Sequence, residues 1–212
     1  MLLDFDGPVC SVFPSNRGRE SGDSMRRLLG GRWAQLPQEI SDADDAFVVL
    51  RYFDHHEPEL AGKAEQAFAA EERKTVLSAI PTPGALDAIR ALQGSGHTIT
   101  IVSNNSESAI LAFIDLHGLH GEIDGVVGRI RSRTEDLKPE PHLLRRALYA
   151  RAAAPADAVL IGDSVTDIQA ARAAGTAVIA YANKSRKESQ LLAAGPDALI
   201  HSMGDITESA GQ

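Results

Sequence analysis

Two carboxylates stand close together near the start of the sequence. Asp4 and Asp6 follow the apolar residues Leu2 and Leu3 and precede Gly7. Side chains two residues apart in an extended segment point the same way, so we expect Asp4 and Asp6 to face one site. Two carboxylates at that distance repel each other unless a cation lies between them or one of them holds a proton. The stretch is therefore a candidate metal or acid–base site, although Asp and Gly are also ordinary turn residues.

A second pair of carboxylates stands where a strand pattern gives way to a helix pattern. Asp163 and Asp167 are four residues apart, and both can face the same side if a helix begins near Ser164. With Asp4 and Asp6 they would supply four carboxylates, and oxygen ligands of this kind suit a hard cation such as Mg²⁺. Negative residues are also favoured in the first turn of any helix, so simple helix capping is the competing interpretation.

Alternating helices and strands are expected from Pro81 onward. The strand patterns lie near residues 97–102, 125–128, 158–161, 176–181 and 197–200, and the helix patterns over 82–92, 107–117, 141–150, 165–174 and 186–194. This alternation predicts a parallel sheet with helices on both faces. Functional residues of such folds gather at the carboxyl ends of the strands. Asp4, Ser103 and Asp163 each end an apolar strand, so we expect them to meet at one edge of the sheet.

The segment between the first strand and this alternating region is mainly helical in pattern. We expect a polar, mobile loop over residues 15–22, and then helices over 23–29, 41–53 and 58–78, the first capped by Asp23 and the second by Ser41. Only residues 47–50 could also form a strand. The expected organisation is a core of residues 1–13 and 80–212 and a helical cap subdomain of residues 14–79.

Composition limits the classes of protein. The 212 residues, of which 43% are hydrophobic, suit one domain or one domain with an insertion. A net charge of −8 argues against a general nucleic-acid or membrane-surface binder. The single cysteine, Cys10, is expected in the core rather than as a nucleophile. No apolar run reaches the length of a membrane span, and the acidic start argues against a signal peptide, so we expect a cytoplasmic location.

Four short motifs together resemble the signature of the haloacid dehalogenase-like (HAD) hydrolase superfamily. They are Asp4-Phe5-Asp6-Gly7, Ser103-Asn104, Lys138-Pro139 and Gly162-Asp163-Ser164-Val165-Thr166-Asp167, which fit in order, spacing and placement. Within the superfamily, the chain looks like the phosphoglycolate phosphatase and phosphomutase group. The resemblance covers residues 1–13 and 81–203. It implies a Rossmann-like three-layer α/β/α core with a mainly parallel sheet, and the helical insertion stands where the family has a cap.

The resemblance implies a role for each matching residue. Asp4 would be the nucleophile that forms an aspartyl-phosphate, and Asp6 the general acid and base. Ser103 and the backbone near Asn104 would bind the phosphoryl oxygens. Lys138, which alone would be taken for a surface residue, would neutralise charge on Asp4 and on the phosphoryl group.

The resemblance also implies a Mg²⁺ cofactor. The ion would be held by the carboxylates of Asp4 and Asp163 and the main-chain carbonyl of Asp6, with Asp167 binding it directly or through water. The chain departs from the family pattern at Pro8, where threonine is usual, and in having only three residues before Asp4. We expect both departures to affect stability more than chemistry.

The expected activity is Mg²⁺-dependent hydrolysis of a small phosphorylated metabolite. A sugar phosphomutase and a non-catalytic binding protein of the same fold are the alternatives, whereas Asp6 argues against a dehalogenase. Substrate choice is expected to depend on the cap, where Arg17 and Arg19 could clamp an acidic leaving group and His55 or His56 could face the crevice. Ordinary solvated side chains are the competing interpretation for all four. The sequence leaves the oligomeric state open.

Overall fold

Six parallel strands form the centre of the computed structural model, which describes residues 1–12, 17–131 and 133–210. Their order in the sheet is β3-β2-β1-β4-β5-β6. The strands are β1 (Leu2–Leu3), β2 (Thr100–Ser106), β3 (Gly125–Arg129), β4 (Val159–Gly162), β5 (Ala177–Tyr181) and β6 (Ala198–Ile200). Although β1 is only two residues long, it lies in the middle and pairs with both β2 and β4. The predicted α/β fold with a parallel sheet is confirmed.

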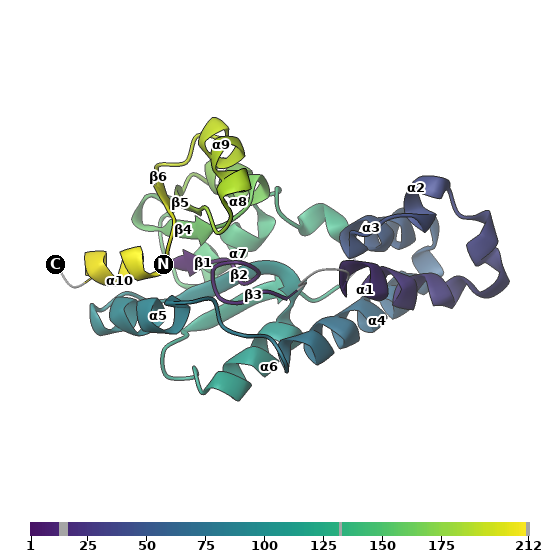
Figure 1. Cartoon of the computed structure of the whole chain (residues 1–212), viewed down its shortest axis with the longest axis horizontal. Coiled ribbons are helices and arrows are strands. Elements are labelled where there is room, and N and C mark those ends of the chain that lie inside the picture. Colours follow the sequence, from purple (N-terminus) through teal and green to yellow (C-terminus); the bar gives the residue numbers. More distant parts are fainter. Residues whose placement is uncertain (13–16, 132, 211–212) are drawn as a thin grey trace.

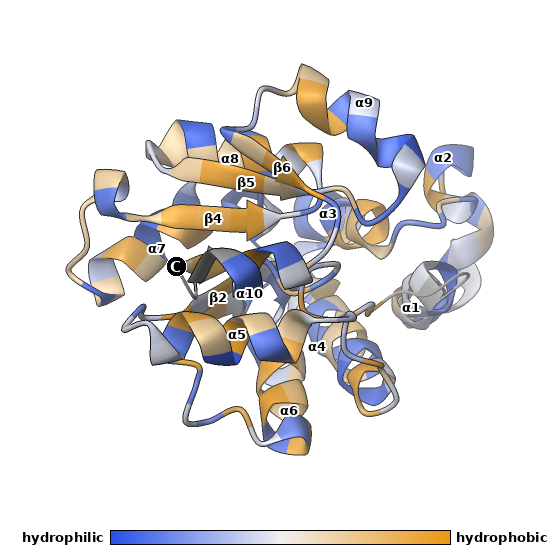
Figure 2. Cartoon of the chain, turned by 60° about the vertical axis from the view of Figure 1, so that its left-hand side comes forward, coloured by the Kyte–Doolittle hydropathy of each residue, from blue (hydrophilic) through white to orange (hydrophobic). Residues whose placement is uncertain are grey.

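Helices cover both faces of this sheet (Figure 1). One face carries α5 (Ala85–Gly94), α6 (Glu107–His117) and α10 (Gly204–Ala210), and the other carries α7 (His142–Ala150), α8 (Val165–Ala174) and α9 (Ser185–Ala193). Buried apolar side chains fill both layers, with Phe5 and Phe113 edge to face in one and Leu144 and Ile168 in the other. The apolar colouring of the strands in Figure 2 reflects this burial on both faces.

Local capping residues fix the helices that lie next to the carboxyl edge of the sheet. At the start of α6, Ser106 Oγ accepts a hydrogen bond from the Ala109 amide, and Gly118 ends the helix in the left-handed conformation. Ser164 and Asp167 form a capping box at the start of α8. Because these signals are local, the predicted bounds of both helices, 107–117 and 165–174, agree with the structure.

Four helices pack together beside the carboxyl edge of the sheet, at the right of Figure 1. They are α1 (Arg17–Arg26), α2 (Gln38–Ser41), α3 (Ala46–His56) and α4 (Pro58–Val76). We call them the cap helices. Met25, Leu50, Phe53 and Phe68 form their shared apolar core, which is separate from the two cores of the sheet. Three short 3₁₀ segments complete the described elements: Arg27–Gln35, Thr134–Asp136 and Pro155–Asp157.

The cap helices differ from the sequence prediction at their starts. The predicted mobile loop over residues 15–22 is wrong from residue 17 onward, where α1 begins, and residues 13–16 lie outside the described part of the chain. Asp23 lies inside α1 and pairs with Arg26 instead of capping the helix. Asp45, not Ser41, caps α3 by accepting from the Phe47 amide, and residues 47–50 are helical. Tertiary packing of α1 overrides the loop-like composition of its first two turns.

Arg26 explains part of this packing. Its guanidinium is fully buried and donates to the main-chain carbonyls of Ile40 and Ala43 at 2.6–2.9 Å, as well as to Asp23. The arginine thus ties α1 to α2 and to the segment that follows it. Buried carbonyl groups that lose such a donor are costly to leave unpaired.

We therefore expect Arg26→Met to lower the free energy of unfolding by about 2–4 kcal/mol, because it removes the charge and leaves two buried carbonyls without partners. Urea unfolding followed by circular dichroism measures the change. The neighbouring Arg27 is exposed, so Arg27→Met is the matched control and should stay within about 0.5 kcal/mol of the wild type. Equal effects of the two substitutions would contradict the assignment.

Candidate active site

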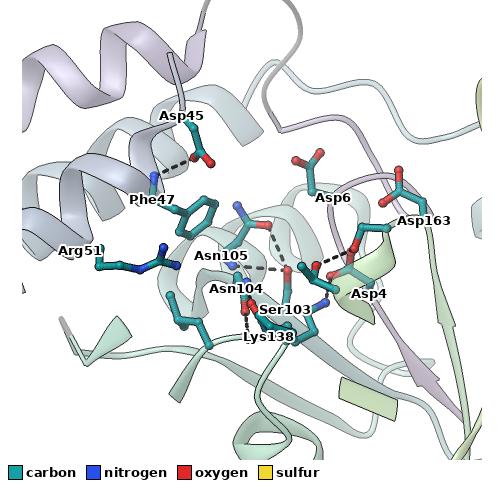
Figure 3. Close-up of a pocket in the computed structure, with 14 residues that line it drawn as sticks. Asp4, Asp6, Asp45, Phe47, Arg51, Ser103, Asn104, Asn105, Lys138 and Asp163 are labelled. Carbon is teal, nitrogen blue, oxygen red and sulfur yellow. Dashed lines mark hydrogen bonds and ion pairs between the residues drawn. The ribbon is translucent and has the colours of Figure 1, made fainter. Parts of the chain in front are cut away.

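A cavity of about 320 Å³ opens where the carboxyl ends of the strands face the cap helices (Figure 3). The side of the sheet contributes most of the residues that the sequence singled out: Asp4, Asp6, Ser103, Asn104, Lys138 and Asp163. The cap side contributes Asp45, Phe47 and Arg51, all at or after the start of α3. The crossover topology thus brings together residues that are far apart in the chain.

Three carboxylates gather at this edge of the sheet, and two of them, Asp4 and Asp163, line the cavity. Asp4 follows β1, Asp163 follows β4 and Asp167 lies in the first turn of α8, and one oxygen of each lies within 4.8 Å of the others. All three residues are buried. Their negative charges are brought together by the pairing of β1 with β4, which places Asp4 next to the strand that ends at Gly162.

Lys138 supplies positive charge inside the cluster. Its Nζ donates to Asp4 Oδ1 at 2.7 Å, to Asp167 Oδ1 at 2.5 Å and to the Val102 carbonyl at 3.2 Å. Burial lowers the pKa of Lys138, but the charges of Asp167 and Asp4 outweigh burial and raise the pKa above its ordinary value. The interpretation of Lys138 as a surface residue is therefore wrong, since its side chain is almost fully buried.

The side chain of Asn104 places Lys138 at this point. The Asn104 carboxamide donates to the Lys138 carbonyl at 3.1 Å and accepts from the Lys138 amide at 2.8 Å. This reciprocal pair fixes the backbone of Lys138 against the end of β2. Asn104 thus both lines the cavity and holds the backbone of Lys138 in place.

The carboxylate cluster suits a divalent cation. Burial and the neighbouring charge of Asp167 raise the pKa of Asp4 to about 7, although Lys138 opposes this shift. Lys138 pairs with Asp4 and Asp167, and Lys187 pairs with Asp163, so two ammonium groups face three carboxylates. An all-oxygen donor set with this charge is what Mg²⁺ prefers, so the residues fit the metal that the sequence predicts.

Asp163 has two partners that the sequence did not single out. Lys187 Nζ donates to Asp163 Oδ2 at 2.5 Å and Asn183 Nδ2 donates to the same oxygen at 2.7 Å. Burial raises the pKa of Asp163, and these two contacts oppose the rise. Gly7 crosses directly above, with φ +118°, where a Cβ atom would lie 2.4 Å from Asp163 Cγ. Only glycine allows the backbone to approach the carboxylate so closely.

Asp6 lies beside the cluster without belonging to it. Its Oδ1 accepts a hydrogen bond from the Val12 amide at 2.8 Å, which fixes the side chain at the rim of the cavity. Burial raises the pKa of Asp6 to about 6. A carboxyl with a pKa near the working pH is suited to giving up and taking back a proton.

Ser103 is buried at the end of β2, within the lining of the cavity. Its hydroxyl donates to Asn105 Oδ1 at 3.0 Å, and it accepts from the Asn105 amide at 3.3 Å.

Cys10 is fully buried in the core, as the sequence predicted. Burial raises the pKa of its thiol.

The cap residues that the sequence singled out lie elsewhere. Arg19 pairs with Asp44 at 3.2 Å, His55 bonds to the Arg51 carbonyl and His56 packs on Tyr52. None of the three is in the lining of the cavity, and the side chain of Arg17 lies outside the described part of the structure. Two of the cap residues that do line it, Phe47 and Arg51, are one helical turn apart. That spacing was visible in the sequence, but which face of α3 meets the sheet was not.

None of the helices in the described part of the chain combines the length and the apolar character that crossing a bilayer requires.

Comparison with known proteins points to one family. A family model described as haloacid dehalogenase-like hydrolase matches residues 45–181, which is more than half of the chain. The chain is 27% identical over 168 residues to the pyrophosphatase PpaX of Bacillus pumilus, covering 79% of this chain and 69% of the relative. It is 28% identical over 205 residues to a plasmid phosphoglycolate phosphatase of Cupriavidus necator, covering 96% and 79%.

A solved structure shows the same fold. CbbY from Rhodobacter sphaeroides, crystallised as a variant with xylulose-(1,5)bisphosphate, superposes with a TM-score of 0.69 at 18% identity, covering 96% of this chain and 94% of that one. The family match begins at residue 45, after β1. The pairing of β1 with β2 and β4 places Asp4 and Asp6 beside the matched region in the fold. The chain therefore belongs to the haloacid dehalogenase-like hydrolase family.

Proposed function

We propose that this protein is a Mg²⁺-dependent phosphatase that hydrolyses a small phosphorylated metabolite through an aspartyl-phosphate on Asp4. The observation that carries the proposal is the buried Asp4 carboxylate, which lines an open cavity and is held 2.7 Å from Lys138 Nζ beside two further carboxylates. The names of the relatives, phosphoglycolate phosphatase and pyrophosphatase, support a phosphorylated substrate.

The first half of the reaction uses Asp4 and Asp6. A carboxylate oxygen of Asp4 attacks phosphorus and forms a bond to it, while the bond from phosphorus to the leaving oxygen breaks. Asp6 donates its proton to the leaving oxygen, which departs as an alcohol. In the second half, Asp6 takes a proton from a water molecule, which attacks the phosphorus and releases inorganic phosphate and the free Asp4 carboxylate.

The surrounding groups position the phosphoryl group and balance its charge. Lys138 faces Asp4 and supplies one positive charge, and the Ser103 hydroxyl donates to a phosphoryl oxygen. Mg²⁺ would be held by Asp4, Asp163, Asp167 and the main-chain carbonyl of Asp6, and when bound it supplies positive charge to the phosphoryl oxygens. Lys187 and Asn183 hold the Asp163 carboxylate toward the cluster.

Residues of the cap helices determine which leaving groups the cavity binds. Lys138 is committed to two carboxylates and a carbonyl, whereas Arg51 has no hydrogen bond or ion pair from its guanidinium to any residue that the structure describes. Arg51 points into the cavity from α3, across from the carboxylates (Figure 3). We therefore assign to the substrate a second anionic group, a carboxylate or a phosphate, which the planar guanidinium binds with two parallel hydrogen bonds.

Asp4→Asn is expected to reduce phosphate release from p-nitrophenyl phosphate by at least about 10³-fold, because an amide cannot act as the nucleophile. The variant should unfold at or above the wild-type temperature, since it relieves repulsion among the carboxylates. If the folded variant keeps an activity within tenfold of the wild type, Asp4 is not the nucleophile. Transfer of the phosphoryl group to a sugar instead of water would indicate a phosphomutase.

Removal of divalent cations by EDTA should abolish turnover, and Mg²⁺ should restore it, because the carboxylate cluster is under-compensated without an ion. Asp163→Asn should raise the Mg²⁺ concentration for half-maximal activity by at least about tenfold. Asp157 is an exposed carboxylate far from the cavity lining, so Asp157→Asn is the control and should leave this concentration unchanged. Full activity in EDTA would contradict the metal assignment.

Arg51→Ala should raise KM for a phosphomonoester with a second anionic group, such as phosphoglycolate, by about 10- to 100-fold, the equivalent of a charged hydrogen-bond pair. KM for p-nitrophenyl phosphate, whose leaving group carries no carboxylate or phosphate, should change little. Arg19→Ala is the control, because Arg19 is a cap arginine already paired with Asp44. A uniform rise in KM for both substrates would argue against a second anionic group.

A further inference from the structure

A continuous chain of buried hydrogen bonds runs from cap helix α4 to Ser103. Glu72 Oε1 accepts from Asn105 Nδ2 at 3.0 Å, and Asn105 Oδ1 in turn accepts from Ser103 Oγ at 3.0 Å. Glu72 Oε2 accepts from the Ser106 amide at 3.0 Å. Glu72, Ser103, Asn105 and Ser106 are all buried.

Arg129 holds the Glu72 carboxylate in place. From the end of β3, it donates to both oxygens of Glu72 at 2.8 and 3.2 Å and to Glu65 at 2.6 Å. Its guanidinium also donates to the Asn104 carbonyl at 2.7 Å and lies 4.2 Å from the centre of the Phe68 ring. With side-chain exposures of 0% for Glu72 and 1% for Arg129, neither group has water as an alternative partner.

This arrangement determines which way the Asn105 carboxamide faces. As the partner of Arg129, the Glu72 carboxylate only accepts hydrogen bonds, so the NH₂ group of Asn105 must face it. The carbonyl oxygen of Asn105 therefore faces Ser103 and receives its hydroxyl proton. The charge on Glu72 thus fixes both the place and the direction of the Ser103 hydroxyl, through one intervening side chain.

We propose that Glu72 is a positioning residue, which acts from the cap helix through Asn105 to hold the Ser103 hydroxyl where it meets the phosphoryl oxygens. The inference rests on the proposed function for the role of Ser103. It goes beyond that function by making the position of α4 a determinant of the phosphate site.

Glu72→Gln tests the relay because glutamine can donate as well as accept. Its NH₂ group cannot accept a hydrogen bond from the Asn105 carboxamide, so Asn105 and the Ser103 hydroxyl that bonds to it lose their fixed positions. We expect kcat/KM for p-nitrophenyl phosphate and the affinity for inorganic phosphate with Mg²⁺, measured by calorimetry, each to fall by about tenfold, as for a misplaced binding group. Glu65→Gln removes the same charge from Arg129 without touching Asn105, so it is the matched control and should leave both quantities unchanged.

A double-mutant cycle separates positioning from general damage. In a Ser103→Ala background, Glu72→Gln should cause no further loss, because the group that it positions is gone. Equal losses from Glu72→Gln and Glu65→Gln, or a full additional loss in the Ser103→Ala background, would overturn the proposal. If Glu72→Gln does not fold, Asn105→Ala serves as the second test. It should reproduce the loss and cause no further loss in the Ser103→Ala background. Additive losses of Asn105→Ala and Ser103→Ala would also overturn the inference.

The phosphate titration keeps this test distinct from that of the proposed function. If the wild-type protein binds inorganic phosphate but hydrolyses no phosphomonoester, the phosphatase assignment fails. The effect of Glu72→Gln on phosphate affinity then still supports or overturns the positioning role.

Discussion

Charge balance among buried groups is the constraint on which this structure depends. Asp4, Asp163 and Asp167 are buried close to one another, and uncompensated charges at such positions would cost several kcal/mol each. The chain meets this constraint with basic groups from two separate segments, Lys138 and Lys187, which contact different carboxylates. The remaining negative charge is what makes the cluster receptive to a cation. The need to balance buried charge therefore accounts both for the positions of Lys138 and Lys187 and for the ability of the cluster to bind a cation.

A second buried network, centred on Arg129, connects the sheet to the cap helices. The two networks meet at adjacent residues, because the Asn104 side chain holds Lys138 while its carbonyl accepts from Arg129, and Asn105 links Glu72 to Ser103. The end of β2 therefore couples the packing of the cap helices to the geometry of the proposed phosphate site. Such coupling through buried, hydrogen-bonded polar networks is rigid, because each of these groups has its partner within the network.

The sequence predicted the parts of the structure that depend on local signals. The bounds of α6 and α8 agree because their caps are local, and Asp4 and Asp163 were found because strand ends of a parallel sheet meet at one edge. Lys187, Asn183 and Arg51 were missed, since their contacts depend on how α9 and α3 are packed. The start of α1, residues 17–22, was missed because polar, glycine-containing residues indicate a loop unless the packing of the helix is known.

The pairing of β1 with two strands that are distant in the sequence has a consequence for how the protein folds. Leu2 and Leu3 pair with residues about a hundred positions away in β2 and about 160 positions away in β4. During synthesis on the ribosome, the segment that carries Asp4 therefore emerges before both of its neighbours and can pair with them only after β4 has been made. Loop closure over such separations is slow, so the segment that carries Asp4 should dock late, after β2, β4 and their helices have formed. Catalytic competence would then mark the last stage of folding.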